Sequence, residues 1–227
     1  RSMQAARRRR KHADRRMGTN RCTGRRATRC RGHHGSRQTR ETAQAAQHLQ
    51  DLGAVVEQVD PGIEDPLDIT TGLWFAGAYQ VWRTLNASQQ ALTDPDFAAQ
   101  AALGAQLDAN AIHQLNQRRG VLGSHLRQFM QAHDLILTPS TAVPAFKARA
   151  AGHSPMDSAA MLGWTPFSYP FNLSQQPAIS LPCGLTREGL PMGVQLVGPM
   201  FGDALVLRAA KALETCYNLL RPDMDKV

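Results

Sequence analysis

The segment from residue 178 to residue 198 reads AISLPCGLTREGLPMGVQLVG and contains two β-type runs. Apolar residues alternate with small or polar ones in the first run, and the second run, GVQLVG, is almost continuously apolar. Glu188 and Gly189 between the runs are typical turn residues. Pro177 and Pro182 cannot donate backbone hydrogen bonds, so they limit the first run to a sheet edge or to short pairing. The segment therefore predicts two neighbouring strands.

Helical and strand patterns alternate on both sides of this pair. Residues 41–53 place apolar side chains at helical spacing and stop at Gly53, and a short alternating strand follows. DLILTPS, residues 134–140, is short and nearly all apolar, as expected of a buried strand. Residues 203–220 predict a final amphipathic helix that Asp203 caps. We therefore expect an α/β or mixed α+β fold.

Further elements are expected between the strands. Residues 66–86 carry a wide apolar face with two tryptophans, which predicts a helix packed on the core. Residues 97–133 read as two amphipathic helices, of which Asp94 opens the first and residues 108–110 form the break between them. Residues 168–177, SYPFNLSQQP, contain two prolines and several polar residues and are expected to form a loop.

Charge divides the chain into two parts. The formal net charge is +8 over 227 residues, but it is unevenly placed. Residues 1–40 hold 14 Arg, Lys11 and only one acidic residue, Asp14, for a net charge of +14. Residues 41–227 hold 11 basic and 17 acidic residues, for a net charge of −6. Because residues 1–40 have almost no Leu, Ile, Val or Phe, we expect this basic segment to be disordered and the folded domain to span residues 41–227.

Three interpretations of residues 1–40 are open. Clustered guanidinium groups displace counterions from phosphates, which favours a nucleic-acid-binding arm, but aromatic interleaving and a recognisable binding module are missing. The spacing of Cys22, Cys30, His33 and His34 matches no common zinc pattern, so we expect no metal site. The bias towards Arg, Gly, Thr, His and Cys also fits a GC-rich gene read out of frame, the hypothesis we favour. The upstream nucleotide sequence tests it.

Composition limits the class of protein. Hydrophobic residues make up 42% and charged residues 19%, as in ordinary globular proteins, and no run approaches the roughly 18 to 20 apolar residues of a membrane span. No apolar stretch follows the basic N-terminus, which argues against a secretory signal. We expect a soluble cytoplasmic protein with no membrane partner. Four cysteines are too dispersed for a disulfide scaffold and are expected to be reduced: Cys22, Cys30, Cys183 and Cys216.

Three segments carry a resemblance to a known family. They are DLILTPSTAVPAF (134–146), WTPFSYPFNLSQQPAISLPCGL (164–185) and GLPMGVQLVGPMFGDALVLRAAKALE (189–214). Together they closely resemble the C-terminal part of amidase-signature enzymes, and the resemblance extends over about residues 41–227. It implies a twisted mixed β-sheet covered by helices and hydrolysis of linear amide C–N bonds through an acyl-serine intermediate. It implies no metal and no organic cofactor.

The catalytic residues of that family have no match in this sequence. Members use a Ser-Ser-Lys triad and a Gly/Ser-rich oxyanion loop, all in the N-terminal half of the enzyme. This sequence has no Gly-Gly or Ser-Ser dipeptide, and its lysines are Lys11, Lys147, Lys211 and Lys226. We therefore assign no catalytic residue and expect an inactive fragment on its own. Two alternatives are the pocket half of a split amidase, with a separate catalytic half, and a non-catalytic protein that binds nucleic acid through its arginines.

The resemblance points to a pocket for a small-molecule amide in the complete enzyme. Its five candidate residues are Trp164, Thr165, Phe167, Tyr169 and Asn172. Aromatic walls with a few polar groups suit an amide or its acyl group, and the alternative is that the aromatic rings simply fill the core. We expect Asn172 to hold the loop through backbone hydrogen bonds more than to touch substrate. Thr165 stands where the related tRNA-dependent amidotransferase has an acidic residue, which disfavours a tRNA-dependent role.

The remaining serine, cysteine and histidine side chains with nucleophilic or metal-binding chemistry are expected to have structural roles. Ser174 and Ser180 have no base beside them in sequence, and Ser180 fits a strand residue that faces away from its apolar neighbours. No cationic neighbour is indicated for Cys183, so we expect a small buried residue there. The helical histidines are expected to be solvent-facing or packed: His113, His125 and His133.

Overall fold

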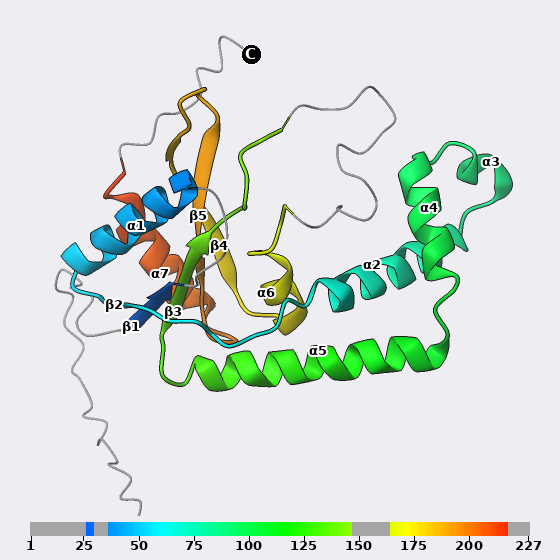
Figure 1. Cartoon of the computed structure of the whole chain (residues 1–227), viewed down its shortest axis with the longest axis horizontal. Coiled ribbons are helices and arrows are strands. Elements are labelled where there is room, and N and C mark those ends of the chain that lie inside the picture. The colour runs from blue at the N-terminus through cyan, green and yellow to red at the C-terminus, as the bar shows by residue number, and fades with distance from the viewer. Residues whose placement is uncertain (1–25, 30–35, 147–163, 218–227) are drawn as a thin grey trace, which may run out of the picture.

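A single five-stranded sheet organises the molecule (Figure 1). The computed structural model describes residues 26–29, 36–146 and 164–217. The strands are β1 (Arg26–Arg29), β2 (Val55–Gln58), β3 (Leu135–Pro139), β4 (Ala178–Leu185) and β5 (Pro191–Val197), in the order β2-β1-β3-β5-β4. β1 pairs in parallel with β2 and β3, whereas β5 pairs antiparallel with β3 and β4. The expected mixed sheet with helices is confirmed.

Helices cover both faces of this sheet. In the described residues they are α1 (Ser36–Asp51), α2 (Leu67–Trp82), α3 (Ala87–Gln90), α4 (Pro95–Gly104), α5 (Ala109–Phe129), α6 (Tyr169–Ser174) and α7 (Asp203–Glu214). We call the face under α1 and α7 the first face, and the face under α5 and α6 the second face (Figure 1). α2 leads away from the sheet towards α3 and α4 (Figure 1). None of these helices has the length and hydropathy that a membrane span requires.

The hairpin of β4 and β5 forms as the sequence predicts. Gly189 has φ of 83°, which favours glycine, and its N–H donates to the Thr186 carbonyl at 3.1 Å. The Thr186 N–H donates to the Leu190 carbonyl at 2.8 Å and closes the turn. β4 lies at the edge of the sheet, as Pro177 and Pro182 predict, and its pairing is irregular between Pro182 and Gly184.

Alternate residues of the inner strands form two cores. On the first face, Val194 and Leu196 are 0% exposed and pack with Leu213 of α7. On the second face, Ile136 and Val197 are also fully buried, in one cluster with residues of α2, α5 and α6. Because successive strand side chains point to opposite faces, β3 and β5 each contribute to both cores.

The N-terminal part differs from the expectation. Residues 26–29 form β1 and α1 begins at Ser36, although we expect residues 1–40 to be disordered and the domain to begin at Glu41. β1 pairs in parallel with a strand on each side, so its backbone N–H and C=O groups have hydrogen-bond partners. Such pairing does not require large apolar side chains. The residues with zinc-ligand chemistry, Cys22, Cys30, His33 and His34, lie outside the described residues.

The helices confirm some expectations and correct others. The Asp94 side chain accepts a backbone N–H group and caps α4, as predicted. Asp108 lies at the expected break, and its side chain caps α5. α2 does not bury its whole apolar face, because Trp74 is 54% exposed and donates its indole N–H to Gln100 at 2.9 Å. α2 instead packs closely on α4, where a Cβ on Gly104 would lie 1.9 Å from the Phe75 carbonyl oxygen.

Two local expectations near the hairpin are wrong. Residues 169–174 form the helix α6, although the sequence predicts a loop there. A helix this short is not stable alone, and burial of most of its side chains stabilises it. Asp203 does not cap α7, because Gly202 is the N-cap and Asp203 is already the first helical residue.

Candidate functional site

A polar row crosses the second face of the sheet. Gln195 of β5 lies opposite Thr138 of β3 on one side and Ser180 of β4 on the other. The buried Gln195 amide donates to the Thr138 hydroxyl at 3.1 Å and to the Phe167 carbonyl at 2.7 Å. A buried amide is costly unless its donors are satisfied, so these bonds hold the chain before α6 against the sheet.

Two serine hydroxyls extend this row to the protein surface. The Ser140 Oγ lies 2.5 Å from the Ser180 Oγ, and the Ser140 N–H donates to the Gly193 carbonyl at 2.9 Å. A Cβ on Gly193 would lie only 2.7 Å from the Ser140 Oγ, so this approach requires glycine. Ser180 is exposed and Ser140 is half-buried, so both hydroxyls can meet a ligand.

The first two predicted pocket residues are anchored beside this pair. The Trp164 carbonyl accepts from the Ala142 N–H at 3.2 Å, and its ring meets Phe146 edge to face with centroids 5.8 Å apart. The Thr165 carbonyl accepts from the Ser168 N–H at 2.9 Å and begins the turn into α6. Both candidates are half-buried, so their side chains remain partly accessible to solvent.

The next two candidates are buried. Phe167 contributes its carbonyl to Gln195, and Tyr169 donates its hydroxyl to the Asp65 carboxylate at 2.6 Å. Asp65 also accepts from the Leu67 N–H at 3.1 Å, so Tyr169 ties α6 to the start of α2. Burial, together with the Asp65 carboxylate, raises the pKa of Tyr169 well above that of a free tyrosine.

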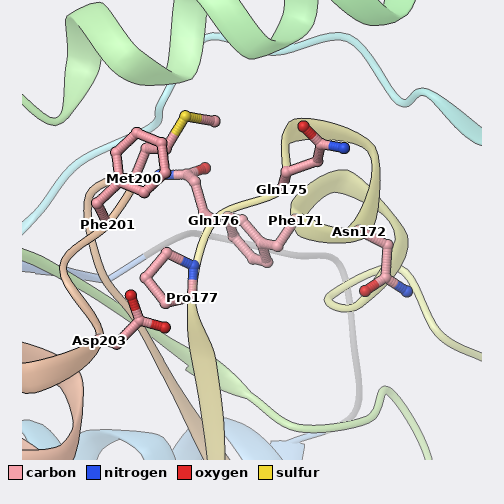
Figure 2. A pocket seen from close by; sticks show the side chains of 8 residues that line it. All are labelled: Phe171, Asn172, Gln175, Gln176, Pro177, Met200, Phe201 and Asp203. Carbon is pink, nitrogen blue, oxygen red and sulfur yellow. The ribbon is translucent and has the colours of Figure 1, made fainter.

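Asn172 lies apart from the other candidates. Its exposed side chain makes no hydrogen bond to a described residue, which differs from the expected role of holding the loop. It lines an open hollow of about 400 Å³, which none of the other four candidates lines (Figure 2). The other lining residues are Phe171, Gln175, Gln176, Pro177, Met200, Phe201 and Asp203. Of the five candidates, Asn172 is thus the one that lines this hollow.

Neither Ser174 nor Ser180 contacts a base within the described ranges. Ser174 is buried and donates to the Gln176 side chain at 2.9 Å, and Ser180 is bonded to Ser140. Lys211, the only described lysine, is exposed on α7 and pairs with Glu214 at 2.7 Å. The described residues thus contain no serine and lysine pair that can form an acyl intermediate.

Cys183 is a core residue, as expected. It is 6% exposed and packs in the first-face core. Burial, with a smaller effect of the Glu41 charge, raises the pKa of its thiol to about 12. Because the thiolate is the nucleophilic form, this shift in pKa disfavours a catalytic role for Cys183.

The helical histidines are packed or exposed, as expected. His125 Nε2 lies 2.6 Å from the Pro61 carbonyl, and His133 stacks on Phe129 with centroids 4.4 Å apart. His113 is exposed. Within the described part of the chain, no group of three His, Cys, Asp or Glu side chains is arranged to hold a metal ion.

The polar row was missed at the sequence level. Gln195 is a polar residue inside the apolar run GVQLVG, and it alternates with Val194 and Leu196. That position predicts an amide on the face opposite the first core. Thr138 gives the same signal in DLILTPS, where it follows three apolar residues.

Comparison with known proteins identifies the family. The sequence model of the amidase family matches residues 31–207, which include the polar row and the segment that Gln195 anchors. The chain belongs to the amidase family. The resemblance to amidase-signature enzymes is thus confirmed, and the match starts before the expected boundary at Glu41.

Individual amidase-family relatives extend beyond this chain. It is 28% identical to the acylamidase of Rhodococcus erythropolis over 184 residues, which are 78% of this chain and 38% of that protein. It is 41% identical to a component of the glutamyl-tRNA(Gln) amidotransferase of Clostridium acetobutylicum over 91 residues, 40% of this chain and 18% of that protein. The crystal structure of a bacterial aryl acylamidase of the amidase signature family superposes with a TM-score of 0.73 at 22% identity, covering 85% of this chain and 44% of that one. The chain therefore spans less than half the length of these relatives.

Proposed function

We propose that this chain forms the substrate side of an amidase that hydrolyses linear amide C–N bonds. In this proposal the catalytic serine and lysine belong to a part outside the 227 residues, and the chain alone is inactive. Family membership and the acylamidase match over 78% of the chain support amide chemistry. The absence of a Ser-Ser or Gly-Gly dipeptide supports the need for a separate catalytic part.

One observation carries the proposal. On the second face, the polar residues of β3 and β5 are buried, whereas the polar residue of the neighbouring strand β4 is exposed. Thr138, Gln195 and Val197 are buried on this face, whereas Ser180 of β4 is exposed. A buried polar row that continues into accessible hydroxyls offers hydrogen bonds to a ligand at the surface. We propose that these hydroxyls face the amide substrate.

The five pocket candidates have different proposed roles. Trp164 and Thr165 contact substrate. They are half-buried, and a hydrogen bond from Ala142 to Trp164 places them beside the carboxyl end of β3. Phe167 and Tyr169 are positioning residues, because Gln195 and Asp65 fix them inside the protein. Asn172 belongs to the hollow in Figure 2 and has no proposed contact with the amide.

Thr165 favours a simple amide over a tRNA-linked role. By resemblance it stands where the tRNA-dependent amidotransferase has an acidic residue for substrate glutamine. A hydroxyl cannot pair with the ammonium group of glutamine as a carboxylate does. We therefore propose acylamidase-type substrates, although the relatives include components of tRNA-dependent amidotransferases.

The test measures 4-nitroaniline release from 4-nitroacetanilide. The purified chain is expected to give no rate above buffer. A polypeptide with the part of the Rhodococcus acylamidase that this chain does not match is then added, and turnover is expected to appear. Trp164→Ala should raise KM by about tenfold, because it removes a substrate wall, while Leu207→Ala on α7 serves as an exposed control.

Two outcomes would count against the proposal. Turnover by the chain alone that disappears in Ser180→Ala or Ser140→Ala would show that it carries its own nucleophile. A stable mixture of the two polypeptides that hydrolyses no aryl or aliphatic amide would contradict the amidase role itself.

A further inference from the structure

The hollow in Figure 2 contains no residue of the polar row. It lies where α6 passes into β4 and where β5 leads into α7 (Figure 2). Ser140 pairs with Gly193 at one end of β5, whereas Met200 and Phe201 lie beyond Val197 at the other end. Met200, Phe201 and Asp203 border one side of the hollow, and Gln175 borders the other (Figure 2).

The backbone at this hollow adopts a costly conformation twice. Gln175 has φ of 61° and Phe201 has φ of 63°, and they are the described non-glycine residues with positive φ. Residues other than Gly, Asn and Asp are disfavoured in this left-handed region. Such residues cluster at ligand sites, where the surrounding structure maintains the strain.

Packing does not explain the presence of Phe201. It stands third in the turn Pro199–Gly202, which the Gly202 N–H closes by donating to the Pro199 carbonyl at 2.8 Å. Turns with positive φ at this position prefer Gly or Asn. The Phe201 side chain is 90% exposed, so burial within the chain does not offset the cost. The ring stands at the edge of the hollow, where a ligand can cover it (Figure 2).

The chemistry of the lining favours a cation. Asp203 is exposed and makes no hydrogen bond or ion pair with a described residue. No Arg, Lys or His among the described residues lines the hollow to neutralise this carboxylate. The face of an aromatic ring attracts ammonium groups, and a carboxylate accepts their N–H groups in strong bonds. The volume of about 400 Å³ suits a small organic molecule.

We propose that this hollow binds a small organic amine in its ammonium form, with the nitrogen between Asp203 and the ring of Phe201. Gln175 offers an exposed amide to a polar substituent on the other side. This site goes beyond the proposed amidase function and does not depend on it, since no residue of the polar row takes part.

Calorimetric titration of the full chain tests the proposal. At pH 7, benzylamine is expected to bind in a saturable way, and benzyl alcohol, its neutral analogue, about tenfold more weakly. Asp203→Asn and Phe201→Asn should each weaken benzylamine binding by about tenfold. Because Asn tolerates the left-handed region, Phe201→Asn should leave the Tm unchanged or raise it by about 2 °C. Leu207→Ala, an exposed apolar position on α7 outside the hollow, is the matched control and should not change the affinity.

Several results would overturn the site. They are the absence of saturable benzylamine binding, equal affinity for benzylamine and benzyl alcohol, and unchanged affinity in either Asn variant. A lower Tm of Phe201→Asn would also overturn it, because Phe201 would then be retained for stability.

Discussion

The first face of the sheet is an apolar core, whereas the second face carries polar residues that reach solvent at β4. On the first face, Val194 and Leu196 of β5 lie beneath α1 and α7. On the second face, Gln195 between them joins Thr138 and the Phe167 carbonyl. Because successive side chains of a strand point to opposite faces, β5 contributes apolar residues to the first face and a polar residue to the second. The polar position in an otherwise apolar strand marks the face on which chemistry is expected.

The cover of the two faces differs as well. On the first face, Leu181 and Cys183 of the edge strand β4 are buried with the inner strands. On the second face the buried cluster contains residues of β3 and β5, whereas Ser180 of β4 is exposed. Apolar burial on the first face thus extends to the edge strand β4. On the second face β4 is less covered, so its Ser180 hydroxyl is accessible to ligands at the cost of some stabilisation.

The largest expected effect comes from a substitution on the first face. Leu196→Ala should lower the free energy of unfolding by about 2 to 5 kcal/mol, because it leaves a cavity in a core where Leu196 is 0% exposed. Ser180→Ala on the second face should change it by less than about 0.5 kcal/mol. Urea denaturation followed by circular dichroism measures both. A loss in Ser180→Ala that approaches the loss in Leu196→Ala would remove the distinction between the faces.

The sequence predicted the elements whose causes are local. The alternation in residues 178–198, the apolar run of β3, the Asp94 cap and the break at residues 108–110 all depend on residues a few positions apart. Short-range patterns decide these elements, so they can be read directly. The short helix α6 was not predictable in this way, since tertiary burial stabilises its six residues.

The site was less predictable because its contacts join distant residues. Gln195 lies 28 residues from the carbonyl it holds, and Tyr169 lies 104 residues from Asp65. The resemblance indicated the segment around Trp164 but not these partners. The helix α2 was predicted, but the exposure of Trp74 was not, because its indole N–H bonds to Gln100, 26 residues away.

Substitution of two tyrosines, one beside each face of the sheet, is expected to have effects of intermediate size on stability. Tyr169, on the second-face side, donates to Asp65, whereas the buried Tyr217 hydroxyl beside the first-face core has no partner among the described residues. Tyr169→Phe should cost about 1 to 2 kcal/mol of unfolding free energy, because it removes a hydrogen bond to a carboxylate. Tyr217→Phe should be neutral or stabilising by up to about 1 kcal/mol, because it removes an unsatisfied group. Equal losses in the two variants would contradict this comparison.

The same tyrosine predicts a response to alkaline pH. Burial raises the pKa of Tyr169, so the folded state holds the phenolic proton more tightly than the unfolded state. Its contribution to stability is complete below the unfolded pKa of about 10 and is lost as pH rises above that value. Unfolding free energies measured from pH 8 to pH 11 should therefore fall, and they should fall less steeply in Tyr169→Phe.

The smallest expected effect concerns the exposed ion pair that links α2 to α5. Asp68 accepts from Arg118 at 2.6 Å, and this bond lowers the pKa of the carboxyl. Because the folded pKa is lowered, the pair stabilises the fold above the unfolded pKa of about 3.9 and loses its effect as pH falls through the folded value. Both side chains are more than half exposed, so Asp68→Asn should lower the Tm by less than about 2 °C at pH 7. The difference in Tm should vanish at a pH below the folded pKa of Asp68. It should also vanish in 1 M NaCl, where the Debye length is about 3 Å. A difference in Tm that persists under both conditions would mean that Asp68 acts through packing, and that α2 and α5 need more than charge to hold them together.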